Sequence, residues 1–177
     1  GLSEKDFDSV RQLAEDVRRA DPQPGRPLMC HAVSALDRYS RLGLVLRTDR
    51  LPLGTSFELS EFDSWIRDRI ALCRPGTPIW ATVQTDPTPS VVQQLSALNP
   101  TGQLSLPSVE DEQIEMLTLL SAAAGARAMI FRSHSRLDEN NDNARHRALI
   151  LTLVNQQLSL FEPWLAAGTR VSTIQTS

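Results

Sequence analysis

The stretch at residues 78–84, PIWATVQ, has the pattern of a buried β-strand, and its surroundings decide the fold class. It follows a helical pattern that Pro75 and Gly76 bring to an end. Two other short apolar runs, GLVLRT at 43–48 and RAMIFR at 127–132, also follow helical patterns. A mostly apolar run bounded by turn residues is typical of a strand that is buried on both faces of a parallel sheet.

Helical patterns alternate with such strands along the whole chain. We expect helices at 3–20, 34–41, 60–74, 108–125 and 144–166, one or two helical turns at 91–98, and a further strand at 27–33, PLMCHAV. Ser3 with Asp6 has the spacing of a capping box, and Ser60/Asp63 and Ser108/Asp111 are expected to mark the starts of two later helices. Strict alternation predicts the α/β class, with a parallel sheet and right-handed crossovers.

The number of strands suggests half of a barrel. Four strands can form a small open sheet, but they are half of the eight in a (β/α)₈ barrel, whose usual length is about 250 residues. The chain of 177 residues also begins with a helix that no strand precedes. We therefore interpret residues 1–177 as a single α/β domain that forms the C-terminal half of a TIM barrel.

Composition and motifs exclude several classes of function. A net charge of −3 gives no overall attraction to nucleic acid, and no apolar run approaches the roughly 20 residues of a membrane helix. The sequence has no G-x-S-x-G, G-x-G-x-x-G, P-loop or H-E-x-x-H motif, and the three histidines lack zinc-site spacing. We expect no nucleic-acid partner, no membrane insertion, no metal and no cofactor, and we interpret Cys30 and Cys73 as buried thiols.

Four stretches resemble the C-terminal half of the glycoside-hydrolase-like TIM barrels of large bacterial proteins. They are DRLPLGTS at 49–56, PGTPIWATVQTD at 75–86, AAAGARAMIF at 122–131 and LVNQQLSLFEPW at 153–164. The resemblance implies that the four strands correspond to barrel strands five to eight. It also implies a domain that acts on or binds a polysaccharide or glycan, within a longer secreted or cell-envelope precursor.

The resemblance also implies a catalytic candidate. In retaining glycosidases of this clan, the nucleophile is a carboxylate at the end of strand seven and the acid/base is a glutamate at the end of strand four. Asp86 is the nearest match to the nucleophile, although glutamate is usual there, and the acid/base would lie before residue 1. Two other interpretations of Asp86 remain open, namely a ligand of sugar hydroxyls and a loop or cap residue.

Other polar residues follow the same strands and are expected at the sugar-binding edge. The substrate-binding candidates are His31, Asp49, Arg50, Gln84, Arg132 and His134. Four of them also have a structural interpretation: Asp49 with Arg50 could form a rim salt bridge, and Arg132 and His134 could make rim hydrogen bonds. We expect Trp80 to pack in the core or against helices, and the Asx-rich segment 138–143 to lead into the last helix rather than bind calcium.

Three functions stay open from the sequence. The first is a glycoside-hydrolase-like domain with a carbohydrate ligand. The second is a barrel without catalysis that serves as a carbohydrate-binding or structural module of a larger surface protein. The third is a self-contained half-barrel interaction domain that dimerises through its open edge strands. The expected partner is accordingly the remaining half of the barrel or a second copy.

Overall fold

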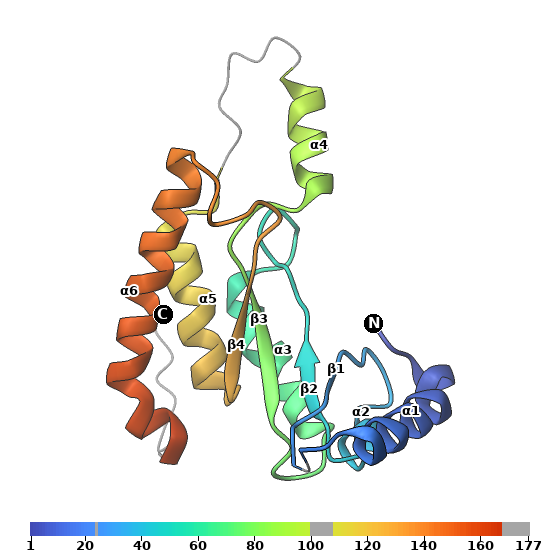
Figure 1. The fold of residues 1–177 in the computed structure, drawn as a ribbon. Helices are drawn as coiled ribbons and strands as arrows, with labels where there is room; N and C mark the ends of the chain where they lie inside the picture. The colour runs from blue at the N-terminus through green and yellow to red at the C-terminus, as the bar shows by residue number, and fades with distance from the viewer. Residues whose placement is uncertain (24, 100–107, 168–177) are drawn as a thin grey trace.

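Four parallel strands form one sheet in the computed structural model, which describes residues 1–23, 25–99 and 108–167 (Figure 1). The strands are β1 (Met29–Cys30), β2 (Val45–Thr48), β3 (Ile79–Gln84) and β4 (Ala128–Arg132). The helices are η1 (Glu4–Asp6), α1 (Phe7–Ala20), α2 (Leu36–Ser40), α3 (Leu59–Ala71), α4 (Pro89–Leu98), α5 (Asp111–Ala124) and α6 (Asp142–Ala167). Helices alternate with parallel strands, so the predicted α/β class is confirmed.

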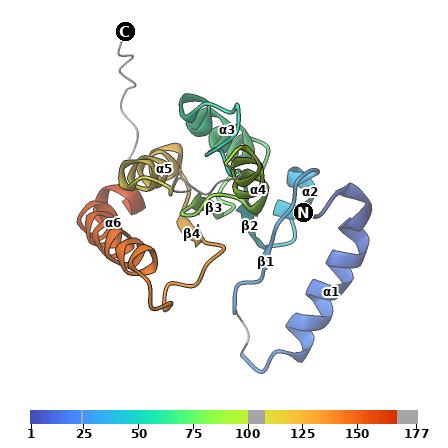
Figure 2. The same ribbon diagram turned by 90° about the horizontal axis from the view of Figure 1, so that it is seen from above.

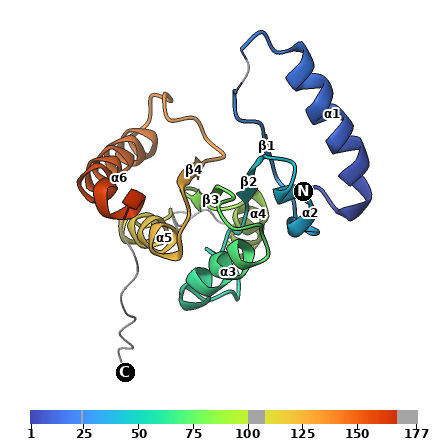
Figure 3. The ribbon, with the colours of Figure 1, turned by 90° about the horizontal axis from the view of Figure 1, so that it is seen from below.

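The order of the strands shows how the helices cover the sheet. The spatial order β1-β2-β3-β4 equals the order along the chain. Crossovers of one hand that always step in the same direction place their helices on one face, whereas a doubly wound sheet reverses direction and has helices on both faces. Helices α3, α5 and α6 accordingly follow one another along one side of the sheet (Figures 2 and 3). This is the arrangement of one half of a (β/α)₈ barrel.

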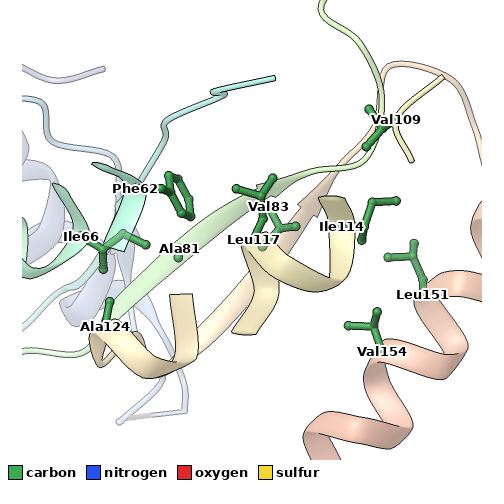
Figure 4. Packing of buried hydrophobic residues seen from close by; sticks show 10 residues of the cluster. All are labelled: Phe62, Ile66, Ala81, Val83, Val109, Ile114, Leu117, Ala124, Leu151 and Val154. Atoms are coloured by element: carbon green, nitrogen blue, oxygen red, sulfur yellow. The ribbon is translucent and has the colours of Figure 1, made fainter. Parts of the chain in front are cut away.

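The main core lies between β3 and the helices on that side. Ala81 and Val83 of β3 point toward α3 and α5, where Leu117 and Phe62 are buried (Figure 4). Leu151 and Val154 of α6 extend the same cluster beyond α5. A second cluster surrounds Tyr39, which is fully buried and donates a hydrogen bond of 2.7 Å to the carbonyl of Ser3. The apolar residues at helical spacing thus face the sheet.

The opposite face of the sheet carries the alternate residues of each strand. Trp80 pairs in register with Arg47, and Ala81 pairs with Thr48. Because Ala81 packs toward the helices, Trp80 projects from the other face together with Arg47. The expectation of core or helix-side packing for Trp80 is therefore wrong. Period-two alternation could not tell which face the helices would cover.

Several predicted boundaries shift. Ser3 and Asp6 form the expected capping box, with a hydrogen bond of 2.7 Å from Ser3 N to Asp6 Oδ2. The caps predicted at Ser60/Asp63 and Ser108/Asp111 are wrong, because Glu58 and Glu110 occupy these N-cap positions. Strand β1 is shorter than the predicted 27–33. Adjacent polar residues can all cap a helix, so the path of the preceding loop selects one of them.

Helix α6 is the longest helix described, with 26 residues, and it includes Pro163. Its inner face is buried, whereas Leu149, Leu153, Leu160 and Trp164 on its surface are exposed. Polar residues interrupt its apolar positions, and no helix in the described part of the chain is apolar over a length that would cross a bilayer.

Both cysteines are free thiols. Cys73 is buried as predicted, whereas Cys30 is only half-buried. Burial raises the pKa of Cys30 to about 11, and burial also raises the pKa of Cys73. Both thiols are therefore protonated at neutral pH and are weak nucleophiles.

Candidate functional site

Asp49 is the centre of a polar cluster at the carboxyl end of the sheet. It directly follows β2 and lies on the same face as Arg47, two residues earlier. Arg47 Nε donates a hydrogen bond of 2.7 Å to Asp49 Oδ1, and Arg47 Nη2 donates to Oδ2. The hydroxyl of Thr82 in β3 donates a hydrogen bond to Asp49 Oδ1. Two neighbouring strands thus hold the carboxylate in a fixed orientation.

The outer strands add two more predicted residues to this cluster. His31, which follows β1, places Nδ1 3.7 Å from Asp49 Oδ2. Arg132, the last residue of β4, places Nη1 3.6 Å from the same oxygen. His31, Asp49 and Arg132, which are far apart in sequence, therefore meet because the carboxyl ends of parallel strands lie at one edge. All four strands contribute to the cluster.

The electrostatics of the cluster favour an ionised Asp49. Burial by itself would raise the pKa of Asp49, but hydrogen bonds from Arg47 and Thr82 and the nearby positive charges outweigh it, so the pKa is lowered. Burial lowers the pKa of His31; Asp49 opposes this effect and the arginines reinforce it. The hydrogen bond to Asp49 raises the pKa of Arg47. At neutral pH the cluster thus contains two guanidinium groups, one carboxylate and a mainly neutral imidazole.

A polar hollow of about 490 Å³ opens beside Asp49. Its lining comes from the end of β2, the following loop and the first turns of α3: Asp49, Arg50, Leu51, Thr55, Ser56, Phe57 and Glu61. Arg50, a predicted binding residue, lies over the ring of Phe57 at 4.3 Å from its centroid. Its predicted rim salt bridge with Asp49 does not form, because Arg47 takes that role. Hydroxyl, guanidinium and carboxylate groups therefore surround this space.

A second hollow, of about 710 Å³, lies between β4 and α6. Ala126 and Arg127, which directly precede β4, form part of its lining, together with apolar residues of α6 such as Leu158. It extends from the amino end of β4 and contains none of the predicted site residues. In parallel α/β sheets, ligands bind at the carboxyl ends of the strands, so we take the smaller polar hollow as the candidate site.

Asp86 is held by a loop and by a buried arginine. Its Oδ2 accepts hydrogen bonds from Ser135 Oγ at 2.6 Å, Ser135 N at 3.1 Å, Ser133 Oγ at 3.2 Å and His134 N at 3.3 Å. Arg147 Nη1 of α6 lies 2.8 Å from the same oxygen. Burial would raise the pKa of Asp86, but these hydrogen bonds and the charge of Arg147 lower it. Asp86 is thus ionised and ties the loop after β4 to α6.

Gln84 and His134 do not join the Asp49 cluster. Gln84 is buried, accepts a hydrogen bond of 3.0 Å from Leu53 N and donates one of 3.0 Å to the carbonyl of Asp86. The imidazole of His134 is exposed, and its backbone N–H is the group that bonds Asp86. Gln84 therefore connects the loop after β2 to the end of β3.

Replacing Gln84 by Leu should destabilise the protein while leaving its core volume nearly unchanged. The substitution leaves the half-buried N–H of Leu53 without its partner, which should cost about 1 kcal/mol. Chemical denaturation measures the loss, and amide exchange at Leu53 should accelerate. Gln93→Leu, on the exposed surface of α4, is the matched control and should change stability little. Equal stability of the two variants would contradict the role assigned to Gln84.

Sequence reasoning missed several residues that hold the site together. Arg47, Thr82 and Arg147 are the main ones, and Glu61 reaches the hollow from α3. A signal was present for Arg47, because it lies two residues before Asp49 and so shares its face of the strand. No comparable signal marked Arg147, because the packing of α6 against the rest of the domain decides which residues its side chain meets.

The described residues offer no ready metal site. Among residues 1–23, 25–99 and 108–167, no three His, Cys, Asp or Glu side chains gather as metal ligands would. In the Asx-rich segment, Asn141 Oδ1 accepts a hydrogen bond of 2.8 Å from Ala144 N at the start of α6. The predicted role of 138–143 as a lead-in to the last helix is therefore confirmed.

Comparison with known proteins does not assign the chain to a family. No family model, no curated protein and no solved structure matches it. The geometry of the strand ends therefore carries the functional argument.

Proposed function

We propose that this chain binds a glycan at the carboxyl ends of its strands, as one half of a glycosidase-like barrel. The observation that carries the proposal is the Asp49 cluster, to which all four strands contribute a side chain. The candidate residues lie where barrel enzymes place their ligands. The missing half, supplied by a longer chain or by a second copy, would cover the face that carries Arg47 and Trp80.

The chemistry of the site suits a polyhydroxylated ligand. Sugar hydroxyls both donate and accept hydrogen bonds, so they need fixed donors and acceptors at short range. Arg47 and Arg132 supply donors, Asp49 supplies an acceptor, and the hydroxyl of Ser56 can do both. The contacts from Arg47 and Thr82 restrict the rotation of Asp49, which reduces the entropy lost on binding.

Binding is better supported than hydrolysis. Hydrolysis of a glycosidic bond uses two carboxyl groups about 5–10 Å apart, one of which attacks the sugar or activates water. Asp86 is the proposed nucleophile, but its Oδ2 accepts four hydrogen bonds and is paired with Arg147. Such a carboxylate is a weak attacking group at that oxygen. A second carboxyl group facing Asp86 would be needed to extend the proposal to catalysis.

Replacing Arg47 by Met tests the proposal directly. The variant keeps most of the side-chain volume but removes the donors that orient Asp49, so affinity for the best glycan of an oligosaccharide array should fall about tenfold or more. Isothermal titration measures the change. Arg67→Met is the matched control, because Arg67 is equally exposed at 30% and makes the same two-pronged contact with Asp63, on α3.

The control variant should bind like the wild type. Both substitutions break an arginine–aspartate pair in which the arginine side chain is 30% exposed. Thermal melting of both variants then separates a loss of affinity from a loss of folding. Wild-type protein that binds no oligosaccharide on the array, or equal affinities for the two variants, would refute glycan binding at this edge.

A further inference from the structure

Arg132 differs from the other charged residues of the Asp49 cluster in that its hydrogen-bond donors are unused. Its guanidinium makes no hydrogen bond with any residue that the structure describes, although Nη1 lies 3.6 Å from Asp49 Oδ2. Arg47, in contrast, donates two hydrogen bonds to Asp49. The side chain of Arg132 is 41% exposed, so its donors are accessible at the carboxyl edge. The carboxylate of Asp49 thus attracts the guanidinium of Arg132 but accepts no hydrogen bond from it.

The Asp49 cluster carries an excess positive charge, although the whole chain has a net charge of −3. Two arginines, Arg47 and Arg132, share the single carboxylate of Asp49, whereas Arg50 lies in the hollow that Glu61 also lines. Asp86 does not change the balance, because Arg147 pairs with it. His31 adds charge only when protonated, and burial and the neighbouring arginines oppose its protonation. A neutral ligand would leave this excess charge unpaired.

We propose that the glycan bound at this edge is acidic, and that Arg132 binds the carboxylate of a uronic acid residue. This inference rests on the proposed function and specifies its ligand class. A guanidinium is planar and can donate two parallel hydrogen bonds to a carboxylate, which gives both strength and orientation. The uronate carboxylate takes up the unused donors of Arg132, and the ring hydroxyls reach Asp49 and the hollow beside it.

The test compares acidic oligosaccharides with their neutral esters. Short oligomers of galacturonate, of mannuronate and guluronate, and of hyaluronan are titrated into the full chain, each beside its methyl ester. The acids should bind about ten- to a hundredfold more tightly than the esters, because the ester loses a charge-assisted pair of hydrogen bonds. Added salt should weaken binding of the acids and leave binding of the esters nearly unchanged.

Two variants locate the effect. Arg132→Gln should reduce the affinity for the acids to that for the esters, whereas Arg74→Gln should have no effect, because Arg74 is exposed and precedes β3 at the opposite edge. Equal binding of acids and esters, or preference for neutral glycans, would overturn the acidic class and leave glycan binding intact. Tighter binding of inorganic phosphate than of any uronate would also overturn it. A chain that binds no glycan of either kind refutes the proposed function itself.

Discussion

Replacing Asp86 by Ala should lower the free energy of unfolding by about 3–5 kcal/mol, the usual cost of removing one partner of a buried ion pair. Arg147 is only 4% exposed, and its Nη1 lies 2.8 Å from Asp86 Oδ2. In the described part of the chain Nε of Arg147 has no hydrogen-bond partner, and Nη1 has none besides its ion pair with Asp86. The substitution therefore leaves a buried positive charge without its main compensation. Urea denaturation of the two proteins measures the difference.

Removal of one charge or of both charges separates this explanation from a simple loss of side-chain volume. Arg147→Met alone should also destabilise, since it leaves Asp86 unpaired, but the double variant Asp86→Asn/Arg147→Met should recover much of the loss. Asp63→Ala, which breaks a half-exposed pair on α3, is the control and should cost at most about 1 kcal/mol. Losses that simply add from Asp86→Asn and Arg147→Met to the double variant would show that the two side chains do not act as a pair.

The same pair predicts how stability depends on pH. The pKa of Asp86 is lowered in the folded protein, so the folded state favours the ionised carboxylate. Its contribution is complete above the unfolded pKa, near 3.8, and is lost as the pH falls below that value toward the lowered folded pKa. The double variant should therefore lose less stability than the wild type over this range. An identical acid profile for the two proteins would contradict the assignment.

This prediction also changes how a test of catalysis should be designed. An inactive Asp86→Ala variant would not identify a nucleophile, because unfolding alone would abolish activity. Asp86→Asn is the better probe, since the amide oxygen can still accept hydrogen bonds from Ser133 and Ser135. Activity assays on that variant should accompany a measurement of its stability.

Replacing Leu117 by Ala should destabilise the protein by about 2–5 kcal/mol, because the substitution opens a cavity in a fully buried site. Leu117 is 0% exposed and packs in the cluster between α5 and β3, near Ile114 and Val83 (Figure 4). The helices and the strand that surround it are held by many other contacts, so the cavity cannot collapse completely. Thermal or urea denaturation measures the loss.

Leu119→Ala is the control for this prediction. Leu119 has the same chemistry and lies two residues away on the same helix, but it is 37% exposed. Both substitutions change helix propensity equally, so the difference between them reports burial alone. We expect the control to cost less than about 1 kcal/mol. Similar losses in the two variants would mean that α5 does not pack through the face that carries Leu117.

The elements were predictable because their signals are local. Residues 78–84 were expected as a strand and β3 spans Ile79–Gln84, while the predicted helical turns at 91–98 correspond to α4. Turn residues and apolar spacing depend only on neighbours in sequence. The same reasoning failed at the N-caps of α3 and α5, where several adjacent polar residues could serve and the incoming loop selected one.

The candidate site was predictable in position but not in its contacts. His31, Asp49 and Arg132 were expected at the carboxyl ends of different strands, and the parallel sheet brings them together. Gln84 followed the same rule, yet its side-chain amide is already hydrogen-bonded to the backbone of Leu53 and of Asp86. The rule places a residue at the edge of the sheet, but neighbouring backbone groups decide whether its side chain is free.

The sequence by itself determined the α/β class and the edge of the sheet at which polar residues gather, because alternation of short apolar runs with amphipathic helices leaves few other ways to bury them. Only the tertiary structure decided which charges pair. Asp49 is held by Arg47 and Thr82, whereas Asp86 is held by Arg147 and the loop after β4. Such pairs depend on strand register and on the side of α6 that meets the sheet. These are set by the packing of the whole domain, and among these contacts only that between Arg47 and Asp49 has a local signal, namely their spacing of two residues along the strand.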